Sequence, residues 1–383
     1  MGAEGDGLGR RPPLLVVAAV TAGLVAVSAL AGWWARAGGP RAQPEDPQSL
    51  AGAFLFAAGA LRARQSSEGY WRTPVTPRPA FERATPELNV FTPALIVDLL
   101  DPVARETGLH DALERARGYL RHQIEATGLV HYHGDPGPVD GSRRGCEMPP
   151  DSDDTALVWR IAPKDDLALL RSALQALARH RDDAGLYPTY LADQAAYRCF
   201  YSKYAGHGLN RPDVGVEMHV YLLLAKHDPE AADRLCRALQ PRMADDRIWV
   251  WYTVAPLVPL LRETDLAGSG CPVRVPERRL RTEIAGQQAY LTQARLLRSL
   301  LLNEGPRPSP GPILRALREG AQAGFATVSR TPPLLYHNDP SATPSHYHWS
   351  EDVGYALWLR LYVEGARRWG EALPLPTRPA ETR

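Results

Sequence analysis

Residues 149–156 read Pro-Pro-Asp-Ser-Asp-Asp-Thr-Ala and stand directly before an apolar run that begins at Leu157. Two prolines disfavour helix upstream, and acidic side chains are favoured at a helix N-terminus, where backbone N–H groups lack partners. We therefore expect a buried helix to begin here. One acid is enough for a cap, whereas Asp151, Asp153 and Asp154 place three carboxyl groups within four residues.

Crowding gives these carboxyl groups a possible second role. Like charges repel, so the pKa of at least one group rises and that group keeps its proton. A neutral carboxylic acid in an apolar cavity is a strong proton donor. Two interpretations stay open at this point: a helix cap, and a catalytic acid.

The pattern around this stretch recurs along the chain. Residues 49–64 have apolar side chains at helical spacing with Ser49 as N-cap, and residues 90–100 predict a second helix. Four times along the chain, a leucine stands eight residues before a turn residue: Leu61 and Gly69, Leu120 and Gly128, Leu177 and Gly185, Leu239 and Arg247. Successive leucines of this series are 59, 57 and 62 residues apart. Such a period suits two helices and a substantial loop.

The second helix of each unit is the more apolar, as a buried inner helix should be. These helices are expected to begin near Phe91, Asp154, Asp213, Tyr252 and Asp352. The repeat is weak between residues 265 and 330, where residues 278–302 fit one long helix or two short ones. Five or six hairpins over residues 49–370 predict an all-α fold, a single-barrel α/α toroid with loops at its mouth. Residues 371–383 are expected to form a flexible tail.

The composition excludes some partners and cofactors. Among 383 residues, 44 Lys and Arg balance 43 Asp and Glu, for a net charge of +1. No field attracts nucleic acid, so no nucleic-acid partner is expected. Cys146, Cys199, Cys236 and Cys271 form no zinc pattern, so no metal site is predicted from them. We expect buried thiols, although the even number permits disulfides.

The N-terminus carries a different signal. Residues 14–34 form a 21-residue stretch without a charge, preceded by Arg10 and Arg11. This length spans a bilayer. We therefore expect a cytoplasmic tail at residues 1–13, a transmembrane anchor at 14–34 and a linker at 35–48. The expected location is that of a single-pass membrane protein with an extracytoplasmic toroid.

Two motifs on this periodic chain resemble those of a known family. Gln65, Gly69 and Trp71 stand as Gln-x-x-x-Gly-x-Trp, which resembles the QW motif of squalene-hopene and oxidosqualene cyclases. Residues 151–156 resemble the Asp-x-Asp-Asp-Thr-Ala motif of squalene-hopene and other class II terpene cyclases. The resemblance implies the toroid of the terpenoid cyclase/protein prenyltransferase superfamily. It also implies that Asp153 is the proton donor, with Asp151 and Asp154 as its neighbours.

The chain departs from other members of that superfamily. It lacks the Asp, Cys and His zinc pattern of protein prenyltransferase β subunits and the Gly-Cys-Gly-Glu-Gln of thioester domains. The Asp-Asp-x-x-Asp motif of class I terpene synthases is also absent. Class II cyclases usually build their active centre with two helical domains, whereas this chain has room for one toroid.

The same resemblance suggests which side chains face the substrate. A histidine usually supports the acid in this family, and aromatic faces stabilise a carbocation. The candidates on or beside inner helices are Trp159, His219, Trp251, Tyr252, His348, Trp349 and Tyr355. The expected partner is a lipid or isoprenoid small molecule. No cofactor is expected, except Mg²⁺ if the substrate is a prenyl diphosphate.

Three function classes remain open. The first is a class II-type cyclase or isomerase that protonates an isoprenoid. The second is a polysaccharide-active toroid, because paired carboxyl groups about 5 to 10 Å apart also suit sugar cleavage. The third is a binding or scaffold domain in which the acidic residues only cap and pack. The fold alone does not distinguish them.

Overall fold

The computed structural model describes residues 49–134, 148–192, 195–198, 210–303, 309–338 and 345–376. Its α-helices are α2 (Leu50–Arg64), α3 (Phe91–Leu100), α4 (Ala104–Thr107), α5 (His110–Gln123), α6 (Ser152–Ile161), α7 (Leu167–His180), α9 (Val214–His227), α10 (Pro229–Leu239), α11 (Leu257–Gly268), α12 (Gln287–Leu302), α13 (Pro310–Arg330) and α14 (Glu351–Arg368). Short 3-10 turns lie at η1 (Asp101–Val103), η3 (Gln240–Arg242), η4 (Asp246–Ile248) and η5 (Glu277–Leu280).

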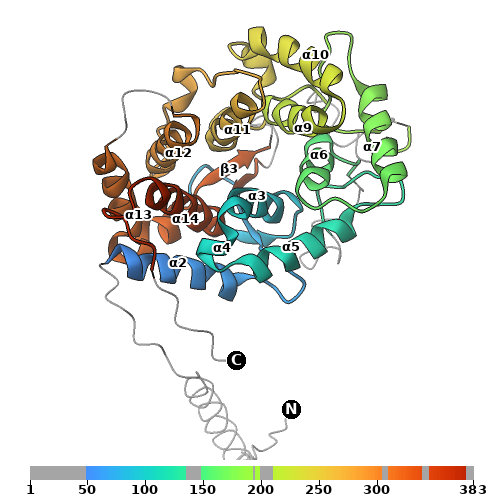
Figure 1. Ribbon diagram of the computed structural model, residues 1–383. Helices are drawn as coiled ribbons and strands as arrows, with labels where there is room; N and C mark the ends of the chain where they lie inside the picture. The colour runs from blue at the N-terminus through green and yellow to red at the C-terminus, as the bar shows by residue number, and fades with distance from the viewer. Residues whose placement is uncertain are drawn as a thin grey trace, which may run out of the picture. The chain divides into compact units, whose positions relative to one another are not determined.

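Within these ranges the helices form two concentric layers (Figure 1). The inner helices α3, α6, α9, α11, α12 and α14 each pack against the next, and α14 packs back against α3. Outside them, α5 lies on α3, α7 on α6, α10 on α9, and both α2 and α13 on α14. Between α11 and α12 the described chain has no outer α-helix, and the 3-10 turn η5 is the regular element within residues 269–286.

The burial of the helices follows their composition. In α3 every residue except Asp98 is buried. The outer helix α10 instead buries only one face, through residues such as Ala232, Leu235 and Leu239. An inner helix touches neighbours on all sides, so it must be apolar all round. The expected contrast between the two kinds of helix is confirmed.

Three of the four predicted turns are built alike. Gly69, Gly128 and Gly185 have φ of 104°, 85° and 84°, where side chains are strained. Each glycine N–H donates to the carbonyl three residues earlier, at 3.0 to 3.1 Å. Arg247, the fourth residue of the series, does not share this positive φ. The repeat predicted from the sequence is therefore a repeat of backbone conformation at three turns.

The QW-like motif fastens the first turn to the rest of the fold. The Gln65 amide donates to the carbonyls of Gly69 and Ala112, at 2.9 and 2.7 Å, so it ties the turn to α5. The Trp71 indole N–H donates to the carbonyl of Leu61 at 2.9 Å. These bonds are structural and bring no side chain to the ring interior.

The prediction of an all-α fold needs a correction. Four short strands form an antiparallel sheet in the order β2-β1-β4-β3: β1 (Thr73–Thr76), β2 (Thr85–Glu87), β3 (Leu334–His337) and β4 (Tyr347–Trp349). Strands of three or four residues are too short to show alternating hydrophobicity in the sequence. They join segments distant along the chain, as in the pairing of Val75 with His348.

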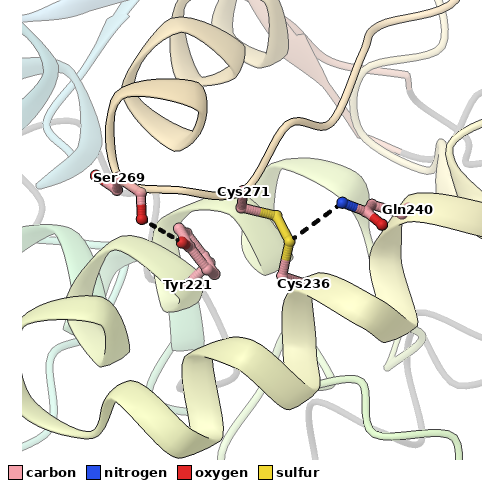
Figure 2. The surroundings of a disulfide bond; sticks show 5 residues. All are labelled: Tyr221, Cys236, Gln240, Ser269 and Cys271. Atoms are coloured by element: carbon pink, nitrogen blue, oxygen red, sulfur yellow. Dashed lines mark hydrogen bonds between the residues drawn. A yellow bond between two sulfur atoms is a disulfide. The ribbon is translucent and has the colours of Figure 1, made fainter.

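A disulfide corrects a second expectation (Figure 2). Cys236 on α10 is bonded to Cys271, which follows α11, with 5.7 Å between the Cα atoms. These residues are therefore not free thiols. Their proximity arises from the packing of distant segments, which cysteine spacing alone does not reveal. A bond that closes a loop over a separation of 35 residues stabilises a fold by about 4 kcal/mol.

The predicted membrane location is also corrected. In the part of the chain that the structure describes, no helix combines the length and the apolar character that a membrane crossing requires. The location as a single-pass membrane protein with an extracytoplasmic toroid therefore has no support here and is withdrawn. The predicted tail, anchor and linker, residues 1–48, lie outside the described residues.

Candidate active site

The acidic stretch starts the inner helix α6, as predicted. Its backbone is held on both sides, because the N–H of Asp151 donates to the carbonyl of Val130 and that of Ser152 to the carbonyl of Thr189, each at 2.8 Å. The Asp151 carboxylate accepts the N–H of Asp153 at 3.1 Å and is the N-cap of α6. The capping interpretation therefore accounts for Asp151 among the three acids.

Asp153 and Asp154 are buried without that role. Asp151, Asp153 and Asp154 are 5%, 8% and 1% exposed. Within the described residues, Oδ1 of Asp154 has no hydrogen-bond partner. Each aspartate offers a carboxylate oxygen, and these atoms lie within 4.8 Å of one another. That spacing also fits three ligands of one divalent cation.

Burial determines the protonation of this aspartate cluster. It raises the pKa of Asp151 and Asp154 well above that of a solvated aspartate, and the charge of Asp153 raises both further. Burial also raises the pKa of Asp153, but hydrogen bonds from Asp151 and from backbone N–H groups oppose the rise. We infer that the three groups together hold at least one proton at neutral pH.

Asp213 and Tyr252 stand beside the cluster. Asp213 caps α9 and accepts the N–H groups of Gly215, Val250 and Trp251 at 2.8 to 2.9 Å. Burial raises the pKa of Asp213 to about 7, and its backbone donors oppose this rise. A methyl group on Gly215 would meet the Tyr252 ring at 2.1 Å, so glycine is required for this contact. Burial and the charge of Asp153 raise the pKa of Tyr252 well above its usual value.

A second polar group lies at the same end of the ring, and the sequence analysis missed most of it. The Tyr132 hydroxyl donates to Glu87 and lies 2.7 Å from the Tyr336 hydroxyl. The Asn89 amide donates to both hydroxyls, at 3.1 and 3.2 Å, while its carbonyl oxygen accepts the N–H of Thr92 in the first turn of α3 at 3.0 Å. Loops before α3, after α5 and at β3 thus meet at one point.

His348 on β4 completes this second group. Its ring stacks on Tyr336, with centroids 4.3 Å apart, and its Nε2 lies 3.7 Å from Oε1 of Glu87. Its Nδ1 is buried without a hydrogen-bond partner in the described residues. Burial lowers the pKa of His348 to about 3, which the backbone of Tyr336 opposes only in part. The imidazole is therefore neutral at physiological pH.

Tyr336 connects the two groups. Burial raises its pKa well above the usual value, and the charges of Glu87, Asp154 and Asp153 act in the same direction. Charges influence a buried phenol this way only at short range. Next to Tyr336, the N–H of His337 donates to the carbonyl of Trp251 at 2.9 Å, and the N–H of Trp251 donates to Asp213 at 2.9 Å. These contacts bring the strand of Tyr336 close to the start of α9 and its buried acid.

Other predicted site residues lie elsewhere in the ring. His219 is fully buried in α9 against the edge of Phe91, and neither ring nitrogen has a partner among the described residues. Burial lowers its pKa to about 3. Trp251 donates from its indole to the Thr189 hydroxyl at 3.2 Å. His219 is therefore enclosed by the inner helices, and Trp251 lies beside Thr189 in the segment before α11.

Three predicted aromatic residues occupy packing positions instead. Trp159 donates to the carbonyl of Gly128 at 2.7 Å and so locks a turn. Trp349 donates to the Thr76 hydroxyl at 2.8 Å. Tyr355 packs against Phe325, with ring centroids 5.2 Å apart. The structure therefore brings Tyr252 and His348, but not these three, toward the acids.

The repeat held a signal for one missed residue. Tyr132 lies four residues after Gly128, and the equivalent positions are Thr73, Thr189 and Trp251. Each of these side chains hydrogen-bonds to other polar groups near the start of an inner helix. The position four residues after the turn residue therefore carries a hydrogen-bonding side chain in each repeat. This pattern could have predicted Tyr132 as a site residue.

Comparison with known proteins supports the fold assignment. No protein-family sequence model matches the chain, and no curated protein is significantly similar in sequence. A variant of the type II terpene cyclase MstE from Scytonema, solved with its substrate geranylgeranyl dihydroxybenzoate, superposes with a TM-score of 0.52 at 15% identity, covering 84% of this chain and 99% of that chain. A protein from Actinoplanes superposes with a TM-score of 0.51 at 15% identity, covering 83% and 100%. The chain has a class II terpene cyclase-like fold.

Proposed function

We propose that this protein is a class II terpene cyclase-like enzyme that protonates an isoprenoid and cyclises or isomerises it. The observation that carries the proposal is the buried cluster of Asp151, Asp153 and Asp154 at the start of an inner helix of a cyclase-like ring. A packing role requires the Asp151 cap alone, so it leaves two desolvated acids unexplained. A proton donor requires such a desolvated neutral acid.

Asp153 is the proposed general acid. It donates a proton to a terminal alkene, whose π electrons form the new C–H bond and leave a tertiary carbocation. Asp151 is within hydrogen-bonding reach of Asp153, and Asp154 neighbours it, so both tune its acidity. The faces of Tyr252 and Trp251 are the proposed partners of the carbocation. His219 is proposed to contact substrate deeper in the ring.

A single ring is sufficient for such an enzyme. The match covers 99% of the MstE chain and 84% of this one, so that cyclase and this protein have comparable extent. The expectation of two helical domains therefore does not count against the proposal. The MstE substrate joins a geranylgeranyl chain to dihydroxybenzoate, and an isoprenoid with an aromatic or polar end group is accordingly the first substrate class to test.

The polysaccharide alternative is weakened by the geometry of the cluster. Carboxylate oxygens of the three aspartates lie within 4.8 Å of one another. Glycosidases place their two carboxyl groups on either side of the scissile bond, about 5 to 5.5 Å apart in retaining enzymes and about 6.5 to 9.5 Å apart in inverting ones, which admit a water molecule. Here all three aspartates stand side by side at the start of one helix. The remaining competitor is a non-catalytic binding domain with a buried acidic cap.

Substitution of the acid tests the proposal. Purified protein is incubated with geranylgeranyl dihydroxybenzoate, squalene and prenyl diphosphates of several lengths, in H2O and in D2O, with Mg²⁺ or with EDTA. We expect a product of unchanged mass in H2O that gains one deuterium in D2O. Asp153→Asn should abolish it while the circular dichroism stays unchanged, because an amide cannot donate a comparably acidic proton.

A matched control separates acid chemistry from helix capping. Asp166 caps α7 by accepting the N–H of Leu169 at 2.9 Å, in an exposed position. Asp166→Asn should keep full turnover, since asparagine is also a good N-cap. Undiminished product from Asp153→Asn would refute the acid, and no product from any isoprenoid would favour a binding domain. Turnover of prenyl diphosphates that EDTA removes would show a Mg²⁺ requirement.

A further inference from the structure

Cyclisation by proton transfer needs a second group besides the acid. A carbocation ends as an alkene only when a base removes a proton from a neighbouring carbon. In a cyclisation the final carbocation forms at a different carbon from the alkene carbon that the acid protonates, so a separate group near that carbon can act as the base. The Glu87 and His348 pair lies at the same end of the ring and is not used by the proposed acid.

The geometry of this pair is that of a base supported by a carboxylate. His348 is 6% exposed, its Nε2 lies 3.7 Å from Glu87, and its Nδ1 has no hydrogen-bond partner in the described residues. The stacked Tyr336 ring fixes the imidazole plane, and the Tyr132 hydroxyl holds Glu87. An imidazole oriented in this way can take a proton while a nearby carboxylate offsets the charge.

We propose that His348, positioned by Glu87, is the general base that takes the terminal proton. The C–H bond next to the carbocation breaks, its electron pair forms the new C=C bond, and the proton moves to the imidazole. The proton then leaves for solvent or for the aspartate cluster, so the cycle consumes no co-reactant. This inference rests on the proposed function.

Burial away from water suits the aspartate cluster to donate a proton and His348 to accept one. Burial keeps the aspartate cluster protonated and keeps the imidazole neutral, because it disfavours the charged form of each. A weakly basic imidazole is adequate for this step, since a C–H bond beside a carbocation is a far stronger acid than an imidazolium. The Tyr336 ring stacks on His348. Burial raises the pKa of the Tyr336 hydroxyl, as do the charges of Asp154 and Asp153.

The test separates substrate consumption from product identity. In His348→Gln, protonation by Asp153 continues, but the cation persists until water or another base reacts. We expect the wild-type alkene to fall by about 100-fold, the usual scale of general-base catalysis. Substrate consumption should fall far less, with alcohols 18 Da heavier or other alkene isomers taking its place. Glu87→Gln should give the same shift more weakly, and Glu87→Asp should restore part of the wild-type product.

Controls make each outcome decisive. His122→Gln, on the outer helix α5, should leave the product profile unchanged. If His348→Gln makes the wild-type alkene at the wild-type rate, the base assignment is wrong although the cyclase proposal stands. If substrate consumption and the wild-type alkene fall equally, His348 supports the acid or the packing of the fold instead. That result also overturns the base assignment. Absence of turnover in the wild type would instead refute the proposed function itself.

A spectroscopic measurement tests the pair without turnover. ¹⁵N NMR of labelled histidine, assigned by the signal that His348→Gln removes, reports the charge of this imidazole at pH 7. We expect a neutral ring. An imidazolium already formed in the resting protein could not accept the proton, and that result would overturn the proposal.

Discussion

The two ends of the inner ring carry opposite chemistry. Where several inner helices begin, carboxyl groups gather, whereas Arg160, Arg262 and Arg360 line a cavity of about 310 Å³ beside the ends of α3, α6 and α12. The helix dipole favours carboxyl groups at the N-termini and Arg160 in the last turn of α6. Arg262 and Arg360 stand near the middle of α11 and α14 and are held by ion pairs instead. We call these regions the acid end and the arginine end.

The ends differ in how their charges are satisfied. At the arginine end Asp98 pairs with Arg262 and, at 2.6 Å, with Arg160, while Arg360 pairs with Glu364 at 3.0 Å. At the acid end like charges adjoin, and burial rather than a counter-ion keeps them neutral. Paired charges serve the fold, whereas Asp153 and Asp154 are crowded together and neither caps a helix. The contrast locates the proposed chemistry at the acid end.

The largest expected effect comes from breaking the ion pairs of Asp98 at the arginine end. Asp98→Ala removes the partner that Arg160 and Arg262 share and, among the described residues, leaves Arg262 only its pair with Asp265, at 3.1 Å. It should lower the free energy of unfolding by about 3 to 5 kcal/mol, the scale for breaking a buried ion pair. Asp101→Ala is the control, since this side chain is 57% exposed in its pair with Arg117. That change should cost less than about 1 kcal/mol. Urea unfolding measures both, and equal losses would refute the contrast.

The next effect concerns the turns that hold the acid end in place. A Cβ on Gly128 would meet the Leu169 carbonyl oxygen at 2.4 Å, whereas one on Gly185 would meet only the Ala238 side chain, at 3.6 Å. Both glycines have positive φ, so each alanine carries about 1 to 2 kcal/mol of backbone strain. Gly128→Ala should cost about 1 to 3 kcal/mol more. The melting temperatures of Gly128→Ala and Gly185→Ala measure this difference in stability. Identical melting temperatures would contradict the expected clash at Gly128.

The smallest effect is a difference in pH dependence. Burial raises the folded pKa of Asp213 to about 7 and of Asp352 to about 6, above their unfolded value of 3.8. At these two sites the folded state binds more protons than the unfolded state, so their contribution to stability is full below about pH 4 and is lost as the pH rises to about 7. Unfolding free energies at pH 5 and pH 8 measure the slope.

Removing one acid should flatten that slope. Asp154→Asn cannot ionise, so the variant gains stability relative to wild type between pH 5 and pH 8, by about 1 to 3 kcal/mol, the scale for a buried unsatisfied group. Asp166→Asn, in the exposed cap of α7, should leave the slope unchanged. A parallel pH dependence for wild type and Asp154→Asn would show that Asp154 is not held neutral.

Local features of the fold could be predicted because they depend on neighbouring residues. Ser49 caps α2 by accepting the N–H of Gly52 at 3.0 Å, as its position before an apolar run indicates. Gly69 and Gly128 stand where the turn requires positive φ. The start of α6 follows from two prolines and a run of acids. Each of these signals lies within a few residues of the feature that it specifies.

The remaining features depend on contacts between distant segments. Tyr132 and Tyr336 are separated by 204 residues, yet their hydroxyls meet, and no local pattern pairs them. The same holds for Cys236 and Cys271, because the spacing of the cysteines along the sequence does not show which of them form a disulfide. Trp159 and Tyr355 were assigned to the site because both are aromatic on inner helices. Which face of such a helix points inward is decided by tertiary packing, and both instead pack in the core.

Closure of the ring has a consequence for how the chain reaches its native state. The seam joins α14 to α2 and α3, and Arg64 binds Asp352 across 288 residues at 2.7 Å. Loop closure over such a separation is entropically unfavourable, and folding slows as contacts become less local. During synthesis α2 and α3 leave the ribosome long before their partner. Their apolar surfaces remain exposed until α14 arrives, so nascent or C-terminally truncated chains are expected to depend on chaperones.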